Sequence, residues 1–148
     1  MPDMVYSRDG LHLTEQFESC RLVAYRDIKG IWTIGWGHTG ADVVPGLTWT
    51  QDQADAALQQ DIQWAARVVN RNVTVDLTQH EFDARVDFVF NVGSGNFHGS
   101  TMLRLLNAGD YHGASEEFEK WDKSGGQVVV GLLRRRLAEE AEFNKEQP

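Results

Sequence analysis

The stretch from Phe82 to Val92, in which apolar residues predominate, constrains the fold of this chain more than any other. Thr78 and Glu81 precede the run with the spacing of a capping box, which marks the start of a helix. From Val86 onward the expected helix is apolar on nearly every side. Because such a helix is stable only when other elements cover it, the run predicts the central helix of a helical lobe.

Further helices are expected on both sides of this run. Thr50 and Gln53 form a second capping box, and the residues after them repeat an apolar position every three or four residues, as one face of a helix does. That face consists of Ala54, Leu58, Ile62, Ala65 and Val69. Other helices are predicted at 11–19, at about 100–108 with Gly109 as the C-cap, at 111–122 and at 131–143.

Residues 23–38 have the composition of strands. The stretches VAY and IWTIGWGH flank the turn sequence DIKG, which predicts a β-hairpin, and the loop-forming residues 39–49 follow. Together the elements predict an α+β, mainly helical fold that forms a single domain over residues 1–148. Its expected parts are a small lobe with a hairpin or small sheet at about 11–60, a helical lobe at about 70–143, and a long joining helix at about 50–71.

The charge balance and the hydropathy pattern exclude several classes of protein. Fourteen Lys and Arg against 22 Asp and Glu give a formal charge of −8 and a pI near 5.0, whereas a DNA-binding domain normally carries a basic face. Nucleic acid is therefore not an expected partner, and the acidic charge should slow approach to any polyanionic surface. No stretch reaches the roughly 18 apolar residues of a membrane span. The first residues also lack the apolar core of a signal peptide.

Cysteine and histidine usage predicts neither a disulfide framework nor a metal site. Cys20 is the only cysteine, which suits a reducing compartment. The histidines are scattered without the spacing of metal ligands, so no metal or other cofactor is expected. They are His12, His38, His80, His98 and His112. His38 could act as a base, but a histidine at such a place is more often a hydrogen-bonded structural group, and we interpret it so.

Three glycines in the stretch WTIGWGHTG have the spacing of a dinucleotide-binding motif. Gly35, Gly37 and Gly40 match G-x-G-x-x-G, which holds a pyrophosphate when a helix follows directly. Here Pro45 and Gly46 interrupt any such helix, so the motif does not predict a nucleotide site. We interpret Gly35 and Gly37 as positions where a strand turns sharply or approaches another backbone.

Glu18, Asp27 and Thr33 are candidate catalytic residues around the hairpin. Glycoside hydrolysis requires one carboxylic acid to protonate the leaving oxygen and a second carboxylate to activate water or stabilise the developing cation. Glu18 at a helix end and Asp27 at the turn could supply them across a cleft, while Thr33 holds the water. The residues alone leave other roles open, because Glu18 could pair with Arg21, Asp27 could cap the turn and Thr33 could be a plain strand residue. Glu15 is a rival acid one helical turn earlier.

The segment FESCRLVAYRDIKGIWTIGWGHTG resembles the phage-type lysozymes, the endolysins of glycoside hydrolase family 24. Their signature is a Glu, eight residues, an Asp, five residues and a Thr, followed by an I-G-x-G-H run. Glu18, Asp27, Thr33 and the run IGWGH match it. The later stretches FNVGSGNF, LLNAGDYHGASEEFEKWDKSGG and GLLRRRLAEEAEF resemble the helical lobe of that family, so the resemblance covers about residues 11–143.

The resemblance implies a lysozyme-like fold with a cleft between its lobes, and it implies the roles of the site residues. Glu18 would be the general acid, Asp27 the second carboxylate and Thr33 the residue that positions water. The bond cleaved would be the β-1,4 bond between N-acetylmuramic acid and N-acetylglucosamine in bacterial peptidoglycan. Inversion of the anomeric centre, as in well-studied members, requires carboxyl groups roughly 6.5–9.5 Å apart. An arginine of Arg134–Arg136 is expected to orient Glu18.

The same resemblance implies substrate contacts for Thr39, Phe90 and Asn91. From the residues alone, Phe90 could equally be a core residue and Asn91 a helix C-cap. One departure from the family pattern is Ser19, which follows Glu18 where the family usually has Gly. If that position required a positive φ, Ser19 would be strained.

The expected partner is therefore bacterial peptidoglycan, with host lysis as the outcome. The resemblance implies a soluble monomer without membrane insertion that gathers in the host cytoplasm and depends on a separate pore-forming protein to reach the wall. Intact outer membranes are not expected to be breached. Two alternatives remain: a lytic transglycosylase, and a non-catalytic peptidoglycan-binding relative.

Overall fold

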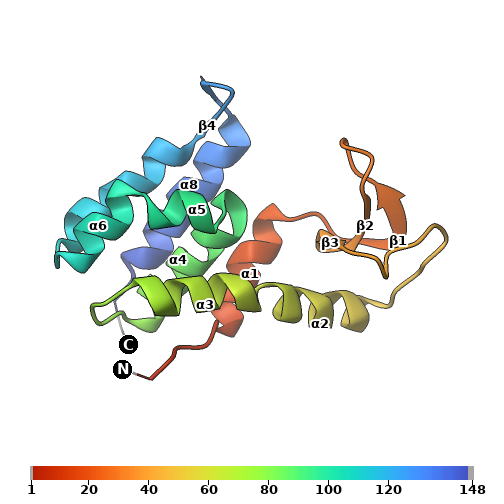
Figure 1. Cartoon of the computed structure of the whole chain (residues 1–148), viewed down its shortest axis with the longest axis horizontal. Helices are drawn as coiled ribbons and strands as arrows, with labels where there is room; N and C mark the ends of the chain where they lie inside the picture. Colours follow the sequence, from red (N-terminus) through yellow and green to blue (C-terminus); the bar gives the residue numbers. More distant parts are fainter. Residues whose placement is uncertain (1, 147–148) are drawn as a thin grey trace. The chain divides into compact units, whose positions relative to one another are not determined.

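The computed structural model describes residues 2–146, which form two compact units (Figure 1). Residues 14–63 make one unit, and the first 13 residues join those from 64 onward in the other. The first unit carries a small antiparallel sheet and the second is almost entirely helical. The predicted α+β, mainly helical fold is thus confirmed.

The sheet of residues 14–63 has three antiparallel strands in the order β1–β2–β3. They are β1 (Arg21–Arg26), β2 (Trp32–Gly35) and β3 (His38–Thr39). Helix α1 (Arg8–Phe17) precedes them and starts before the predicted residue 11. The reason is Ser7, whose Oγ accepts a hydrogen bond from the Gly10 amide at 3.1 Å and so caps the first turn.

The strand predicted to run through His38 is broken between β2 and β3. Gly35 and Gly37 have φ values of +65° and +90°, which side-chain-bearing residues rarely adopt. A Cβ on Gly35 would also lie 3.0 Å from the Trp49 ring. The glycines therefore form a sharp turn with close packing, as interpreted. No helix follows Gly40 until Gln51, which removes the structural basis for a nucleotide site.

The helix predicted at about 50–71 is divided at Ile62 into α2 (Gln51–Asp61) and α3 (Gln63–Asn72). The capping box of Thr50 and Gln53 is present at its start. All five residues of the predicted apolar face, from Ala54 to Val69, are buried. The apolar pattern thus identified the buried face although the helix is not continuous.

Helix α4 (Gln79–Val92) is the central helix of the second unit, as predicted. Thr78 and Glu81 form the expected capping box, and residues 82–89 are all buried. Helix α8 (Val130–Phe143) packs along α4 (Figure 1). Around Phe88 of α4, three aromatic rings pack edge to face with centroids 5.6–6.4 Å away. Those rings belong to Phe97, Phe118 and Trp121.

The remaining elements differ in part from the prediction. Helix α6 (Thr101–Asn107) is where it was expected, but the helix predicted at 111–122 is a short α-helix, α7 (Tyr111–Glu116), followed by a 3₁₀-helix, η1 (Glu117–Trp121). Helix α5 (Ser94–His98) and the hairpin of β4 (Lys123–Ser124) and β5 (Gln127–Val128) were not predicted. Within residues 2–146, no helix has the length and apolar character of a membrane span.

Candidate active site

Asp27 occupies the turn between β1 and β2, and backbone groups hold its carboxylate. Its Oδ1 accepts hydrogen bonds from the amides of Lys29 at 2.8 Å and Ile31 at 2.9 Å. Asp27 therefore caps the turn, which was the structural role left open by the sequence. Its Oδ2 accepts no hydrogen bond from residues 2–146. The side chain is thus fixed through one oxygen, and the other remains available to a reactant.

Thr33 is tied to the same peptide group as Asp27. Its Oγ1 donates a hydrogen bond of 2.9 Å to the Ile31 carbonyl, and this carbonyl also accepts from the Asp27 amide at 2.9 Å. Only 4 % of Thr33 is exposed, so its position in β2 is well restrained. Because the hydroxyl donates its proton to Ile31, its lone pairs are left to accept a hydrogen bond from a water molecule.

Glu18 follows directly after α1 and is half-buried. Its amide donates to the Thr14 carbonyl at 3.1 Å, which continues the helical turn. Its carboxylate lies beside the turn between β2 and β3, because a Cβ on Gly37 would be 3.8 Å from Oε2. Glu18, Asp27 and Thr33 therefore belong to one compact unit.

Ser19, beside Glu18, is unstrained, since no non-glycine residue within 2–146 has a positive φ.

Thr39 lies directly opposite Thr33, because these two residues pair between β3 and β2. Tyr25 of β1 pairs with Thr33 from the other side. Directly opposite residues place their side chains on the same face of a sheet. Tyr25, Thr33 and Thr39 thus form a row across the three strands. Tyr25 was not predicted as a site residue, because its place in the row depends on strand register and leaves no local signal in the sequence.

His38 is a satisfied structural group, as interpreted. Its Nδ1 is 2.8 Å from Asp61 of α2, its Nε2 is 3.0 Å from Asp42, and its ring lies 5.3 Å from that of Trp49. Burial lowers the pKa of His38, but the hydrogen bonds and charges of Asp61 and Asp42 outweigh burial and leave the pKa above its ordinary value. These contacts tie β3 to α2.

Within residues 2–146, no three His, Cys, Asp or Glu side chains gather as metal ligands would.

Phe90 and Asn91 lie at the end of α4, in the helical unit. Phe90 is half-buried with its ring 6.1 Å from that of Trp64, and Asn91 is exposed. Their contacts with substrate stay predictions, as does the contact of Thr39.

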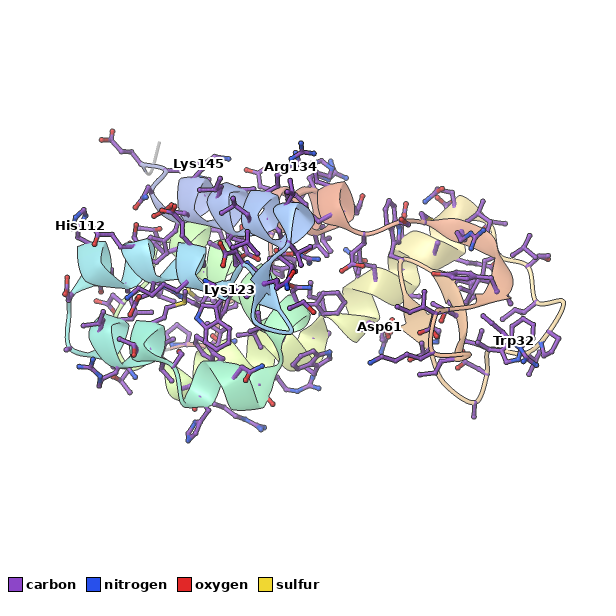
Figure 2. The ribbon with its side chains drawn as sticks, turned by 90° about the horizontal axis from the view of Figure 1, so that it is seen from above. Trp32, Asp61, His112, Lys123, Arg134 and Lys145 are labelled. Carbon is purple, nitrogen blue, oxygen red and sulfur yellow. The ribbon has the colours of Figure 1, made fainter. Side chains whose placement is uncertain are left out.

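The three consecutive arginines of α8 have different surroundings. Arg134 is exposed and extends away from the helix (Figure 2). Arg135 and Arg136 are buried, and they form ion pairs with Asp87 and Glu139, respectively. The predicted orientation of Glu18 by one of these arginines stays a prediction.

Comparison with known proteins decides the family. The model of the phage lysozyme family matches residues 15–139. The chain belongs to the phage lysozyme family. Within this family, the endolysin of Bacillus phage PZA is 42 % identical over 147 residues, which cover 98 % of this chain and 57 % of that protein. The chain thus spans a little over half the length of the first curated relatives that it matches.

Other phage lysozyme relatives match over nearly their whole length. The endolysin of Acyrthosiphon pisum secondary endosymbiont phage 1 is 44 % identical over 144 residues, which cover 95 % of this chain and 98 % of that protein. A crystal structure of a P22 lysozyme mutant superposes with a TM-score of 0.89 at 38 % identity, covering 96 % of this chain and 99 % of that one. The lysozyme fold of this family is therefore present over almost all of the chain.

Proposed function

We propose that this chain is an endolysin that hydrolyses the β-1,4 bond between N-acetylmuramic acid and N-acetylglucosamine in bacterial peptidoglycan and so lyses the host cell. The observation that carries the proposal is the shared anchoring of Asp27 and Thr33. Both side chains are fixed by hydrogen bonds to the backbone of Ile31, and Oδ2 of Asp27 and the lone pairs of Thr33 remain available to a water molecule. A carboxylate and a hydroxyl held in this way can orient a nucleophilic water.

In the proposed reaction, Glu18 donates its proton to the glycosidic oxygen as the bond to the anomeric carbon breaks. The water held by Asp27 and Thr33 attacks that carbon and passes a proton to Asp27. One water is consumed, and one new reducing end and one free hydroxyl form. Attack from the face opposite the leaving group inverts the anomeric centre.

The experiment compares Glu18→Gln and Glu15→Gln with wild type on permeabilised Gram-negative cells. Loss of the general acid should reduce the initial rate of turbidity loss by about 10²-fold or more, whereas Glu15→Gln should retain the wild-type rate. Inactivity of Glu15→Gln with full activity of Glu18→Gln would assign the acid to the rival residue.

Product analysis separates hydrolysis from the two alternatives. Hydrolysis creates reducing ends, whereas a lytic transglycosylase leaves an anhydro-muropeptide that is lighter by one water. A non-catalytic binding relative would yield neither product. Mass spectrometry of digested peptidoglycan, together with an assay of reducing ends, distinguishes the three.

The remaining parts of the proposal concern substrate contacts and the cellular setting. We infer sugar contacts for Thr39, Phe90 and Asn91, orientation of Glu18 by an arginine of Arg134–Arg136, and action as a monomer without a cofactor. The protein would gather in the host cytoplasm until a separate pore-forming protein lets it reach the wall. Expression without such a protein should leave cells intact until their membrane is permeabilised.

A further inference from the structure

The Lys and Arg residues of the unit formed by residues 14–63 all lie on the hairpin that carries Asp27. Its only Lys and Arg residues are Arg21, Arg26 and Lys29. The same unit contains seven carboxylates, which outnumber these cations: Glu15, Glu18, Asp27, Asp42, Asp52, Asp55 and Asp61. All three cations are exposed, and none forms an ion pair with a carboxylate within residues 2–146. In an acidic protein, unneutralised cations on either side of a candidate catalytic carboxylate are available to an anionic ligand.

Arg21 differs from the other two cations because it lies on the face of the sheet that carries Thr33. Its guanidinium carbon is 4.3 Å from the centre of the Tyr25 ring, and Tyr25 pairs directly with Thr33. The pairing of β1 with β2 is irregular between Arg21 and Tyr25. In that interval the amide of Ala24 donates instead to the Leu47 carbonyl, at 2.9 Å. Arg21 therefore extends the row of Tyr25, Thr33 and Thr39 by one more side chain.

Arg26 is a close chemical match to Arg21 on the opposite face. It is also exposed, and its guanidinium carbon is 5.2 Å from the centre of the Trp32 ring. Arg26 pairs with Trp32, one residue out of step with the Tyr25–Thr33 pair. Since successive side chains of a strand point to opposite faces, Arg26 and Trp32 face away from Thr33. The hairpin thus offers two arginines, each stacked on an aromatic ring, of which only Arg21 shares the face of the candidate catalytic row.

We propose that Arg21, held by Tyr25, binds a carboxylate of the peptide stems that peptidoglycan carries on N-acetylmuramic acid. A guanidinium stacked on an aromatic ring keeps the N–H groups at its edge free, and these match a carboxylate in bidentate geometry. The stacking also restricts the side chain before binding, which reduces the entropy lost when the carboxylate docks. The proposal rests on the proposed function, because the stems lie beside the bond that the endolysin would cleave.

Binding of a stem carboxylate by Arg21 would partly offset the repulsion between this acidic protein and an acidic cell wall. A chain with a formal charge of −8 is repelled by a wall that carries many carboxylates. A cation beside the row of Tyr25, Thr33 and Thr39 places local attraction where the substrate must bind. Arg21 would thereby select glycan with charged stems over glycan without them.

The test uses two substrates and three variants. The substrates are native sacculi and sacculi whose peptide carboxylates have been amidated with a carbodiimide and ammonium. The variants are Arg21→Gln, Arg21→Lys and the matched control Arg26→Gln. On native sacculi, Arg21→Gln should raise KM roughly tenfold with little change in kcat, the size expected for one lost charge-assisted hydrogen-bonded pair. On amidated sacculi, wild type and Arg21→Gln should have the same KM.

The controls separate charge recognition from structural damage. Arg26→Gln should stay close to wild type on both substrates, and Arg21→Lys, which keeps the charge but loses the bidentate geometry, should recover only part of the preference for native sacculi. An equal loss for Arg21→Gln on both substrates would overturn the proposal, as would an equal loss for Arg26→Gln. Co-sedimentation with both kinds of sacculi, in a Glu18→Gln background, measures the same preference without cleavage. Failure of wild type to create reducing ends would refute the muramidase function alone, because this binding preference is measured independently.

Discussion

The two units of the molecule differ in the exposure and the partners of their charged residues. On the hairpin of residues 14–63, the carboxylate of Asp27 is held by backbone amides, and the cations Arg21, Arg26 and Lys29 are exposed. In the helical unit, by contrast, several charged side chains are buried in the core, and four of them pair with one another. The difference separates charges that are available to a ligand from charges that stabilise the fold.

The buried cluster of the helical unit consists of Asp87, Arg135, Arg136 and Glu139. Arg135 donates to both oxygens of Asp87, with Nε 3.0 Å from Oδ2 and Nη2 2.8 Å from Oδ1, and Arg136 donates to Glu139 at 2.9 Å. Burial and the neighbouring Asp87 carboxylate raise the pKa of Glu139 well above its ordinary value, against the opposing effect of the two arginines. Each of these charges is neutralised by another member of the cluster.

Arg85 completes the contrast. It is fully buried between the rings of Phe118 and Phe143, with its guanidinium carbon 4.8 and 4.7 Å from their centres. Burial lowers its pKa to about 9. On the hairpin, Arg21 and Arg26 also stack on rings, but there the guanidinium groups are open to solvent. The same contact between cation and ring is therefore a packing interaction at Arg85, whereas at Arg21 it leaves the cation open to a ligand.

The substitution Asp27→Asn tests whether Asp27 does more than cap its turn, and it should reduce activity strongly. In Asp27→Asn, the remaining Oδ1 can still accept from Lys29 and Ile31, but the negative charge is lost. We expect the rate of peptidoglycan hydrolysis to fall by about 10²–10⁴-fold, while the free energy of unfolding changes by less than about 1 kcal/mol. Initial rates and urea denaturation measure the two quantities on the same preparation.

Asp27→Ala is the matched control, because it removes the turn cap as well as the charge. It should be as inactive as Asp27→Asn and less stable. If Asp27→Asn keeps its activity and only Asp27→Ala loses it, Asp27 has a structural role alone and the contrast between the two units disappears.

The next effect in size concerns the buried cluster. Arg136→Met should lower the free energy of unfolding by about 3–5 kcal/mol, because it removes the nearer of the two cations that pair with the buried Glu139 carboxylate and leaves only Arg135, at 3.9 Å. The control Arg134→Met, at the exposed neighbouring position, should change it by less than about 0.5 kcal/mol. Urea denaturation measures both. Equal stability of the two variants would contradict a structural role for the buried charges.

The cost of Arg136→Met should also depend on pH. The folded-state pKa of Glu139 is already raised, and removal of Arg136 takes away a charge that lowers it. A carboxyl whose pKa is raised on folding is tolerated while protonated, and stability falls as pH rises through its folded pKa. The destabilisation should therefore be smaller under acidic than under alkaline conditions.

The sequence predicted the elements and site residues whose signals are local. The capping boxes at Thr50 and Thr78 located two helix starts, and the spacing of Glu18, Asp27 and Thr33 led to the family. The elements that it missed, α5 and the β4–β5 hairpin, are short and have little periodicity. The residues of η1 were predicted to continue an α-helix, but they form a 3₁₀-helix directly after α7.

The sequence could not reveal contacts that depend on distant residues. The run of Arg134–Arg136 has the composition of a solvated surface, yet two of its members are buried, since their partners include Asp87 from α4. Likewise, Tyr25 and Arg21 share a face with Thr33 because β1 pairs with β2 in a register that sets Tyr25 opposite Thr33 and Arg21 opposite Gly35. Register and burial of this kind follow from packing, and no local pattern encodes them.

His38 gives the unit of residues 14–63 a charge network of its own, and its loss should change stability less than the loss of Arg136. Its partners are more exposed than those of the buried cluster, with 63 % of the Asp42 side chain and 32 % of the Asp61 side chain accessible. We therefore expect His38→Gln to lower the free energy of unfolding by only about 1 kcal/mol. Thermal or urea denaturation across a pH series measures it.

The pH range of this effect follows from the two shifted groups. The pKa of His38 is raised, so its ion pairs contribute fully below its ordinary pKa and are lost as pH rises through the raised value. The hydrogen bond from His38 lowers the pKa of Asp42, so the contribution of Asp42 is lost as pH falls through that lowered value. The difference between wild type and His38→Gln should therefore be greatest in mildly acidic solution and shrink on both sides.

Asp42→Asn, which removes only the more exposed partner, should show a smaller difference over the same range. A difference that does not vary with pH would mean that His38 supports β3 by packing against Trp49, without help from its charge.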